Sequence, residues 1–105
     1  MSWNGGWQAA TIADEGTSSD EVDLGRPCDL LEIQIPTIDS GTIKIQVAES
    51  SGGTFLDLGD GLTTASGTHN YADVFKLGGY QFIKVVSSVT QSTAEVLIRV
   101  RGWRY

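Results

Sequence analysis

Few side chains in this sequence have the chemistry that a catalytic site needs. The chain contains one histidine, His69, and one cysteine, Cys28. A nucleophilic mechanism requires a serine or cysteine beside a histidine base, and nothing in the spacing of these two residues indicates that they meet. His69 stands next to Asn70 and Tyr71 in a polar stretch typical of a surface loop, whereas Cys28 is expected as a small apolar residue at the start of a strand. The sequence therefore predicts a protein that is not an enzyme.

Carboxylates gather near the N-terminus, and five of them lie close together: Asp14, Glu15, Asp20, Glu21 and Asp23. Oxygen-rich loops of this kind can hold calcium. Their spacing differs from that of an EF-hand loop, so the favoured interpretation is a solvated acidic face. A single cysteine cannot supply a thiolate cluster for zinc, and no glycine-rich phosphate loop precedes a helix. We therefore predict neither a metal nor another cofactor.

The formal net charge of −6 is unevenly distributed along the chain. Residues 1–60 carry eleven acidic and two basic side chains (net −9), whereas residues 61–105 carry two acidic and five basic ones (net +3). The acidic total argues against nucleic acid as the main partner, because phosphate binding needs a contiguous basic surface. The basic end around Arg99, Arg101 and Arg104 could meet an acidic region of another subunit or lie beside one within the same molecule. Both arrangements remain open.

Aromatic side chains gather at the two ends of the chain, with Trp3 and Trp7 at the start. A tryptophan side chain has a large apolar area, and its burial is favourable. The opening segment is therefore expected either to fold back over the protein or to dock on a neighbour. The candidate residues for partner contacts are Trp3, Trp7, Arg99, Arg101, Trp103, Arg104 and Tyr105. Alternatively, Trp7 and Trp103 simply cover the ends of the domain.

The segments that must position these residues have the two-residue period of β-strands. In residues 42–58, Ile43, Ile45 and Val47 alternate with other residues, a glycine-bearing turn follows, and an apolar stretch begins at Phe55. This pattern predicts a β-hairpin. Further strands are predicted at residues 30–36, 81–87 and 94–103, with weaker ones at 8–13 and 21–24. Turns or loops are predicted between strands, including residues 25–27, 57–61, 77–79 and 88–93.

Short strands at intervals of about ten residues are the signature of an all-β sandwich or barrel. The predicted fold is a single-domain antiparallel β-sandwich, jelly-roll-like, with an immunoglobulin-like arrangement as the alternative. Residues 1–7 are predicted to form an N-terminal arm and residues 8–105 the sandwich. No apolar run approaches the ~20 residues needed to cross a bilayer, and the N-terminus lacks the basic start and apolar core of a signal peptide.

The order of the segments carries a resemblance to a known class of proteins. A polar acidic part ends at EVDLG and is followed by LLEIQIP, TIKIQVAESSGGTFLDL, a polar connection, GGYQFIKVVSS and AEVLIRVRG. In this layout the chain resembles the small β-sandwich proteins of tailed bacteriophage virions, the head decoration or cement proteins. The resemblance implies a non-enzymatic virion protein, assembled in the host cytoplasm, that stabilises the phage head by contacts with the major capsid protein, either as a monomer or as a homotrimer that also contacts itself. Neither nucleic acid nor a membrane is expected as a partner.

A weaker similarity in layout is to the discoidin-type carbohydrate-binding jelly rolls. In that family a strand runs into a turn of the form Ser-x-Asp-Gly-x-x-Trp, and a later strand opens with Ala-Arg-Tyr-Val-Arg. Here the turn ESSGGTF, residues 49–55, lacks the aspartate before the glycine, and GGYQFIKV replaces the arginine-bearing strand. The similarity implies an alternative function as a carbohydrate-binding module on a phage tail or fibre. A tail or connector subunit with the same fold is a further alternative.

Overall fold

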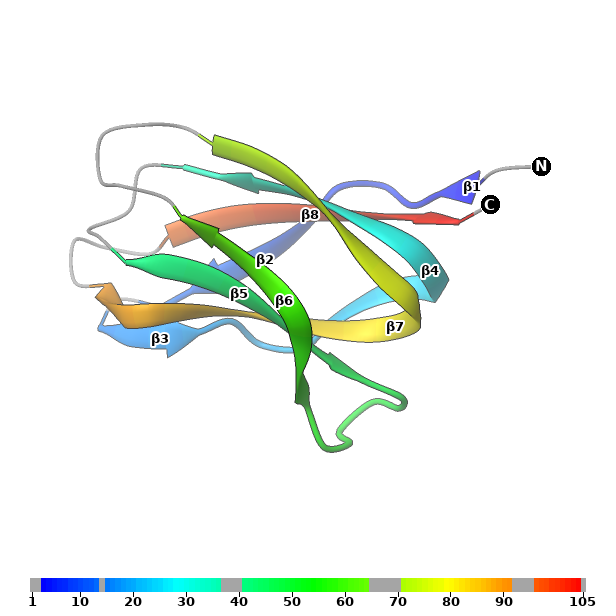
Figure 1. Ribbon diagram of the computed structural model, residues 1–105. Helices are drawn as coiled ribbons and strands as arrows, with labels where there is room; N and C mark the ends of the chain where they lie inside the picture. Colours follow the sequence, from blue (N-terminus) through cyan, green and yellow to red (C-terminus); the bar gives the residue numbers. More distant parts are fainter. Residues whose placement is uncertain (1–2, 14, 37–40, 65–70, 92–95, 105) are drawn as a thin grey trace.

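The computed structural model describes residues 3–13, 15–36, 41–64, 71–91 and 96–104 (Figure 1). These residues form eight strands: β1 (Trp3–Asn4), β2 (Gln8–Ile12), β3 (Gly16–Ser18), β4 (Val22–Ile35), β5 (Thr42–Ala48), β6 (Leu56–Thr64), β7 (Tyr71–Gln91) and β8 (Val96–Arg104). Within these ranges there is no helix long and apolar enough to span a membrane.

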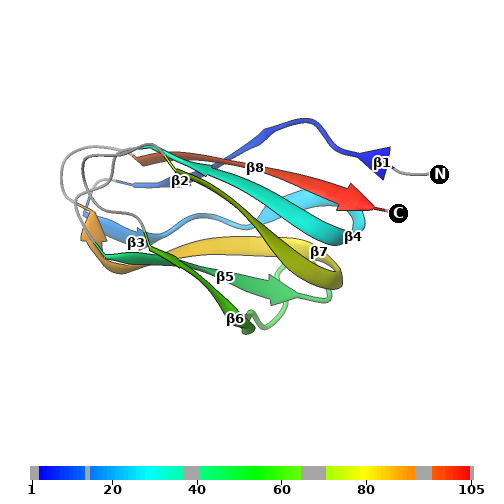
Figure 2. The same cartoon turned by 45° about the horizontal axis from the view of Figure 1, so that its top comes forward.

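The strands form two layers, which are joined because the two longest strands bend from one layer into the other (Figure 2). In the first layer, β8 pairs with β1 and β2 on one side and with residues 30–34 of β4 on the other, and the same part of β4 pairs with the first half of β7. In the second layer, the second half of β7 pairs with β3 and β5, and β5 pairs with β6. All of these pairings are antiparallel.

The bends of β4 and β7 lie next to each other at one corner of the sandwich. Gly25 of β4 and Gly78 and Gly79 of β7 have φ values of 92°, 70° and 101°, which favour glycine because it has no Cβ. The register of the two strands also shifts between Asp23 and Cys28, as expected at β-bulges that bend a strand. The sequence predicted turns at residues 25–27 and 77–79 that would end the strands, and this prediction is wrong because both segments lie inside strands. Both segments bend together, so their pairing continues around the corner.

The hydrophobic core fills the space between the layers. Its side chains come from alternate positions of the central strands, as in β5, where Ile43, Ile45 and Val47 are at most 3 % exposed. Fully burying one such side chain contributes about 1.5–3 kcal/mol. Other strands add Leu31, Ile33, Ile35, Phe75, Ile83, Val85, Ile98 and Val100. The predicted alternation thus identifies the inward face of each central strand.

The predicted all-β antiparallel sandwich is confirmed, and so is the hairpin within residues 42–58, where Val47 pairs with Leu56. Two predicted loops are wrong. Residues 57–61 lie within β6, where Asp57 pairs with Gln46 of β5 and residues 58–61 form an irregularity in the register, and β7 continues to Gln91, with residues 92–93 of the second predicted loop outside the described residues. The opening segment folds back onto the sandwich, since β1 pairs with the end of β8 and the Gly5 N–H donates to the Gly102 carbonyl at 3.0 Å.

Candidate functional site

The outward side of β8 carries three of the seven residues predicted to contact a partner. Arg99, Arg101 and Trp103 project outward at alternate positions, while the residues between them face the core. The pairing of β8 with β4 places Glu32 opposite Arg101 and Gln34 opposite Arg99. Strand alternation therefore puts two guanidinium groups and one indole ring in one row, about 6.6 Å apart along the strand.

A tryptophan from the opening segment lies over this row. The guanidinium carbon of Arg101 is 4.5 Å from the centre of the Trp7 ring and 5.3 Å from that of Trp103, and the guanidinium carbon of Arg99 is 5.2 Å from the Trp7 ring. Such cation–π contacts contribute about 0.5–1 kcal/mol each at exposed sites. They hold the aromatic and guanidinium groups in one arrangement. We call the surface formed by these four residues and Glu32 the β8 face.

The carboxylate of Glu32 anchors Arg101 within the β8 face. Nη2 of Arg101 donates to both carboxylate oxygens at 3.1 Å, and each side chain is 25 % exposed. The ion pair is therefore only partly screened by solvent. Nε of Arg101 and Nε1 of Trp103 are buried without a hydrogen-bond partner among the described residues. Sequence reasoning missed Glu32, which could have been found only from the order and register of the strands.

The remaining predicted contact residues lie apart from the β8 face. Trp3 packs against the edge of the core at the corner, and the guanidinium carbon of Arg26 is 5.2 Å from its ring centre. Arg104 is exposed at the end of β8, opposite Trp3 in the register. Tyr105 lies outside the described residues. The structure therefore brings together Trp7, Arg99, Arg101 and Trp103, and places Trp3 at one end of the sandwich.

A shallow hollow of about 320 Å³ adjoins the β8 face. Trp7 lines it on one side and Val74 of β7 on another, with the polar side chains of Glu32 and Gln34 of β4 between them. Val74 is 55 % exposed. An aromatic ring beside several hydrogen-bonding groups is the composition of many ligand sites, so the hollow extends the candidate site from β8 across β4 to β7.

The described residues give no indication of a catalytic nucleophile or of a metal site. Cys28 is buried, its thiol donates to the Arg26 carbonyl at 3.1 Å, and burial raises the pKa of this thiol. It has the small apolar role predicted, although it lies within β4 and not at a strand start. His69 lies outside the described residues. No group of three or more His, Cys, Asp or Glu side chains within the described ranges could hold a metal ion.

Comparisons with known proteins define the class of fold. No family model matches the sequence, and no curated protein matches it. Among solved structures, a variant of the family 29 carbohydrate-binding module CBM29-2 is 12 % identical with a TM-score of 0.59, covering 98 % of this chain and 80 % of that one. An F5/8 type C domain from Bacteroides fragilis is 8 % identical with a TM-score of 0.58, covering 94 % and 93 %.

A third similar structure is that of YomS, a protein derived from the SPBc2 prophage. It is 16 % identical with a TM-score of 0.54, covering 98 % of this chain and 91 % of that one. At such low identities the similarity concerns the fold alone. The chain therefore has a β-sandwich fold that carbohydrate-binding modules, a discoidin-like domain and a prophage protein share, and the structure of its β8 face must carry any functional argument.

Proposed function

We propose that this protein is a non-catalytic binding module of a tailed bacteriophage virion, which attaches to the major capsid protein through its β8 face. The observation that carries the proposal is the grouping of Trp7, Arg101 and Trp103 on one outer surface of a rigid sheet. Tryptophan and arginine are the residue types most enriched among those that dominate protein–protein binding energy. The layout shared with head decoration proteins and the fold shared with a prophage-derived protein both support this assignment.

Attachment of this kind stabilises a shell by mass action, because the module binds assembled capsid subunits and not separated ones. A stable contact typically buries about 800 Å² on each partner. The β8 face supplies the centre of such a contact, and association as a homotrimer would place three of these faces on one symmetric site of the shell. The stack of rings and guanidinium groups is already formed in the free protein, which limits the ordering cost of binding.

Binding to capsids prepared without this protein tests the proposal. Trp103→Ala removes a ring from the β8 face and should weaken binding about tenfold or more, as expected for a central interface tryptophan. Val89→Ala is the matched control, because Val89 is 38 % exposed on the part of β7 in the second layer. Equal affinities of the Trp103 variant and the wild-type protein, with both variants folded, would exclude the β8 face as the attachment surface.

A second candidate function is carbohydrate binding on a phage tail or fibre. The hollow beside Trp7 favours it, because an aromatic ring can stack on a sugar while Glu32 and Gln34 offer hydrogen-bonding groups to hydroxyls. The fold shared with carbohydrate-binding modules supports this candidate as well.

A glycan array, used together with the capsid-binding measurement, separates the two candidate functions. Sugar binding that is lost in both Trp7→Ala and Gln34→Ala would favour the carbohydrate function. Capsid binding that is lost in Trp103→Ala and retained in Gln34→Ala would favour the virion function. Gln34 is exposed, so its replacement by alanine should leave the sandwich folded.

A further inference from the structure

Two hollows meet at the corner of the sandwich, away from the β8 face. One, of about 350 Å³, is lined by the bend of β7 at residues 78–79, and the other, of about 360 Å³, is lined by the β5–β6 hairpin. Tyr80 and Glu49 line both. Each volume is in the range of small-molecule sites, about 300–1,000 Å³. We call these two residues, with the backbone of residues 78–79, the corner site.

The hairpin wall of the corner site is held in place by contacts with neighbouring strands. The carboxylate of Glu21 accepts hydrogen bonds from the Ser51 hydroxyl at 2.6 Å and from the Gly52 N–H at 2.7 Å. The hydrogen bond from Ser51 and, to a smaller extent, the charge of nearby Lys84 lower the pKa of the Glu21 carboxyl, and Nζ of Lys84 is 4.6 Å from the centre of the Phe55 ring. These contacts hold the loop at two points, residues 51–52 and Phe55. The site is therefore formed before any ligand arrives.

The groups in the corner site are mainly hydrogen-bond acceptors beside an aromatic ring. Tyr80 is partly buried and packs against the core, which fixes its ring. Glu49 is exposed and has no hydrogen bond or ion pair with another described residue. Nε2 of Gln81 donates to Asp23 at 2.8 Å, so its amide oxygen remains as an acceptor. A carboxylate and a ring together attract a cation, through charge and through the negative face of the ring.

We propose that the corner site binds a guanidinium group, as presented by an arginine side chain of a partner protein. A planar guanidinium can stack on the Tyr80 ring while its N–H groups form a fork with the Glu49 carboxylate. The bend of β7 assists, because a Cβ added to Gly78 or Gly79 would meet no atom within 4 Å, so the backbone is uncovered there. The corner site is distinct from the β8 face, and this inference does not depend on the proposed function.

Titration with N-acetyl-arginine amide, followed by the backbone amide signals of residues 49–53 and 78–79, tests the inference. The neutral N-acetyl-citrulline amide has the same shape and serves as the ligand control. We expect saturable shifts with the arginine compound and at least about tenfold weaker binding of the citrulline compound. Glu49→Gln should weaken arginine binding about three- to fivefold, the size expected for an exposed ion pair.

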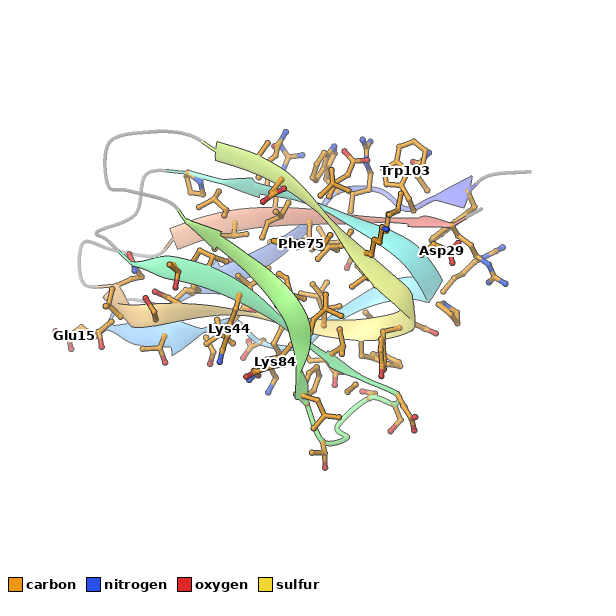
Figure 3. All side chains as sticks on the ribbon, viewed as in Figure 1. Glu15, Asp29, Lys44, Phe75, Lys84 and Trp103 are labelled. Carbon is orange, nitrogen blue, oxygen red and sulfur yellow. The ribbon has the colours of Figure 1, made fainter. Side chains whose placement is uncertain are left out.

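Two further variants make the test specific to the corner. Glu15→Gln removes an equal charge at the far end of the molecule (Figure 3) and should bind arginine like the wild-type protein. Tyr80→Leu removes the aromatic face on which the guanidinium would stack and should weaken arginine binding, as Glu49→Gln does. Equal binding of the arginine and citrulline compounds, equal losses in the Glu49 and Glu15 variants, or stronger saturation by methyl glucoside would each overturn the inference, the last in favour of a sugar site.

Discussion

Arg101 is the residue on which the β8 face depends, because it contacts three other members of that face. Its guanidinium group lies against Trp7 and Trp103 and pairs with Glu32. Residue type and position at the chain ends were sufficient to single out the tryptophans and arginines. They could not predict Glu32, since its contact with Arg101 follows from the pairing of β4 with β8, two strands far apart in the sequence.

Replacing Arg101 by alanine should lower the free energy of unfolding by about 1–2 kcal/mol, through the loss of two cation–π contacts and of the partner of a half-buried carboxylate. Arg101→Lys should lose about half as much, because it keeps the charge but not the planar fork. Urea unfolding followed by circular dichroism measures both values. A loss below about 0.5 kcal/mol for the alanine variant, the size of a neutral surface change, would contradict the anchoring role.

Gly102 is required where β8 passes over Cys28. A Cβ added to Gly102 would lie 2.5 Å from the Cys28 sulfur and 3.3 Å from Cβ of Leu24. Gly102→Ala should therefore destabilise the protein by about 1–3 kcal/mol, as overpacking does. In a Cys28→Ala background the nearest atom is absent, so the same substitution should cost about 1 kcal/mol less. Thermal unfolding of the two single variants and the double variant measures this coupling, and strictly additive effects would refute the contact.

Among the elements, the hairpin and the corner differ in how far the sequence predicts them. The alternation of Ile43, Ile45 and Val47 is a local pattern, and a local turn joins the two strands, so the hairpin was predictable. The glycine-containing segments at 25–27 and 77–79 have the composition of chain-reversing turns. They remain inside β4 and β7 because each segment lies beside the other, as in the pairing of Cys28 with Tyr80. Only knowledge of that long-range pairing would have corrected the prediction.

The bend of β7 should be sensitive to the backbone conformation of Gly79. Its φ of 101° is unfavourable for any residue with a Cβ, although a Cβ there would meet no atom within 4 Å. Gly79→Ala should therefore cost about 1–3 kcal/mol through backbone strain alone. Gly6→Ala is the control, because Gly6 also has open space around it and is not in the left-handed region. Equal stabilities of the two variants in urea would show that the corner tolerates a different bend.

At the scale of the whole molecule, the acidic first part of the chain and its basic end are joined by an ion pair within one molecule. The sequence left open whether the acidic first part and the basic end pair inside the molecule or between subunits. Glu32 and Arg101 form such a pair inside the molecule. Arg99 and Arg104 remain exposed, and Trp103 lies on the side opposite Lys44 and Lys84 (Figure 3). The first part of the chain thus contributes an ion-pair partner to the β8 face, while the exposed arginines remain available for a partner.

Stability of the whole sandwich should fall in acid, because three exposed carboxyls accept hydrogen bonds that exist only in the folded state. The strongest of these bonds lower the pKa values of Glu21 through Ser51, Asp23 through Gln81 and Asp57 through Gln46. A carboxyl whose pKa is lower in the folded than in the unfolded state stabilises the fold fully above its unfolded pKa, about 4. That stabilisation is lost as the pH falls through the lower folded-state pKa. The free energy of unfolding should therefore be nearly constant from about pH 7 to pH 5 and decrease below about pH 4.

The triple variant Glu21→Gln, Asp23→Asn and Asp57→Asn identifies the groups responsible for this acid sensitivity. It should be less stable than the wild-type protein at neutral pH, since amides are weaker acceptors than carboxylates, and should lose less stability on acidification. Urea unfolding at a series of pH values measures both effects, with Glu15→Gln as the control for removing an exposed carboxyl elsewhere. If the triple variant retained the full acid dependence of the wild-type protein, the loss would have to arise from other carboxyls, and the hydrogen bonds that hold the hairpin loop and the corner would contribute little to stability.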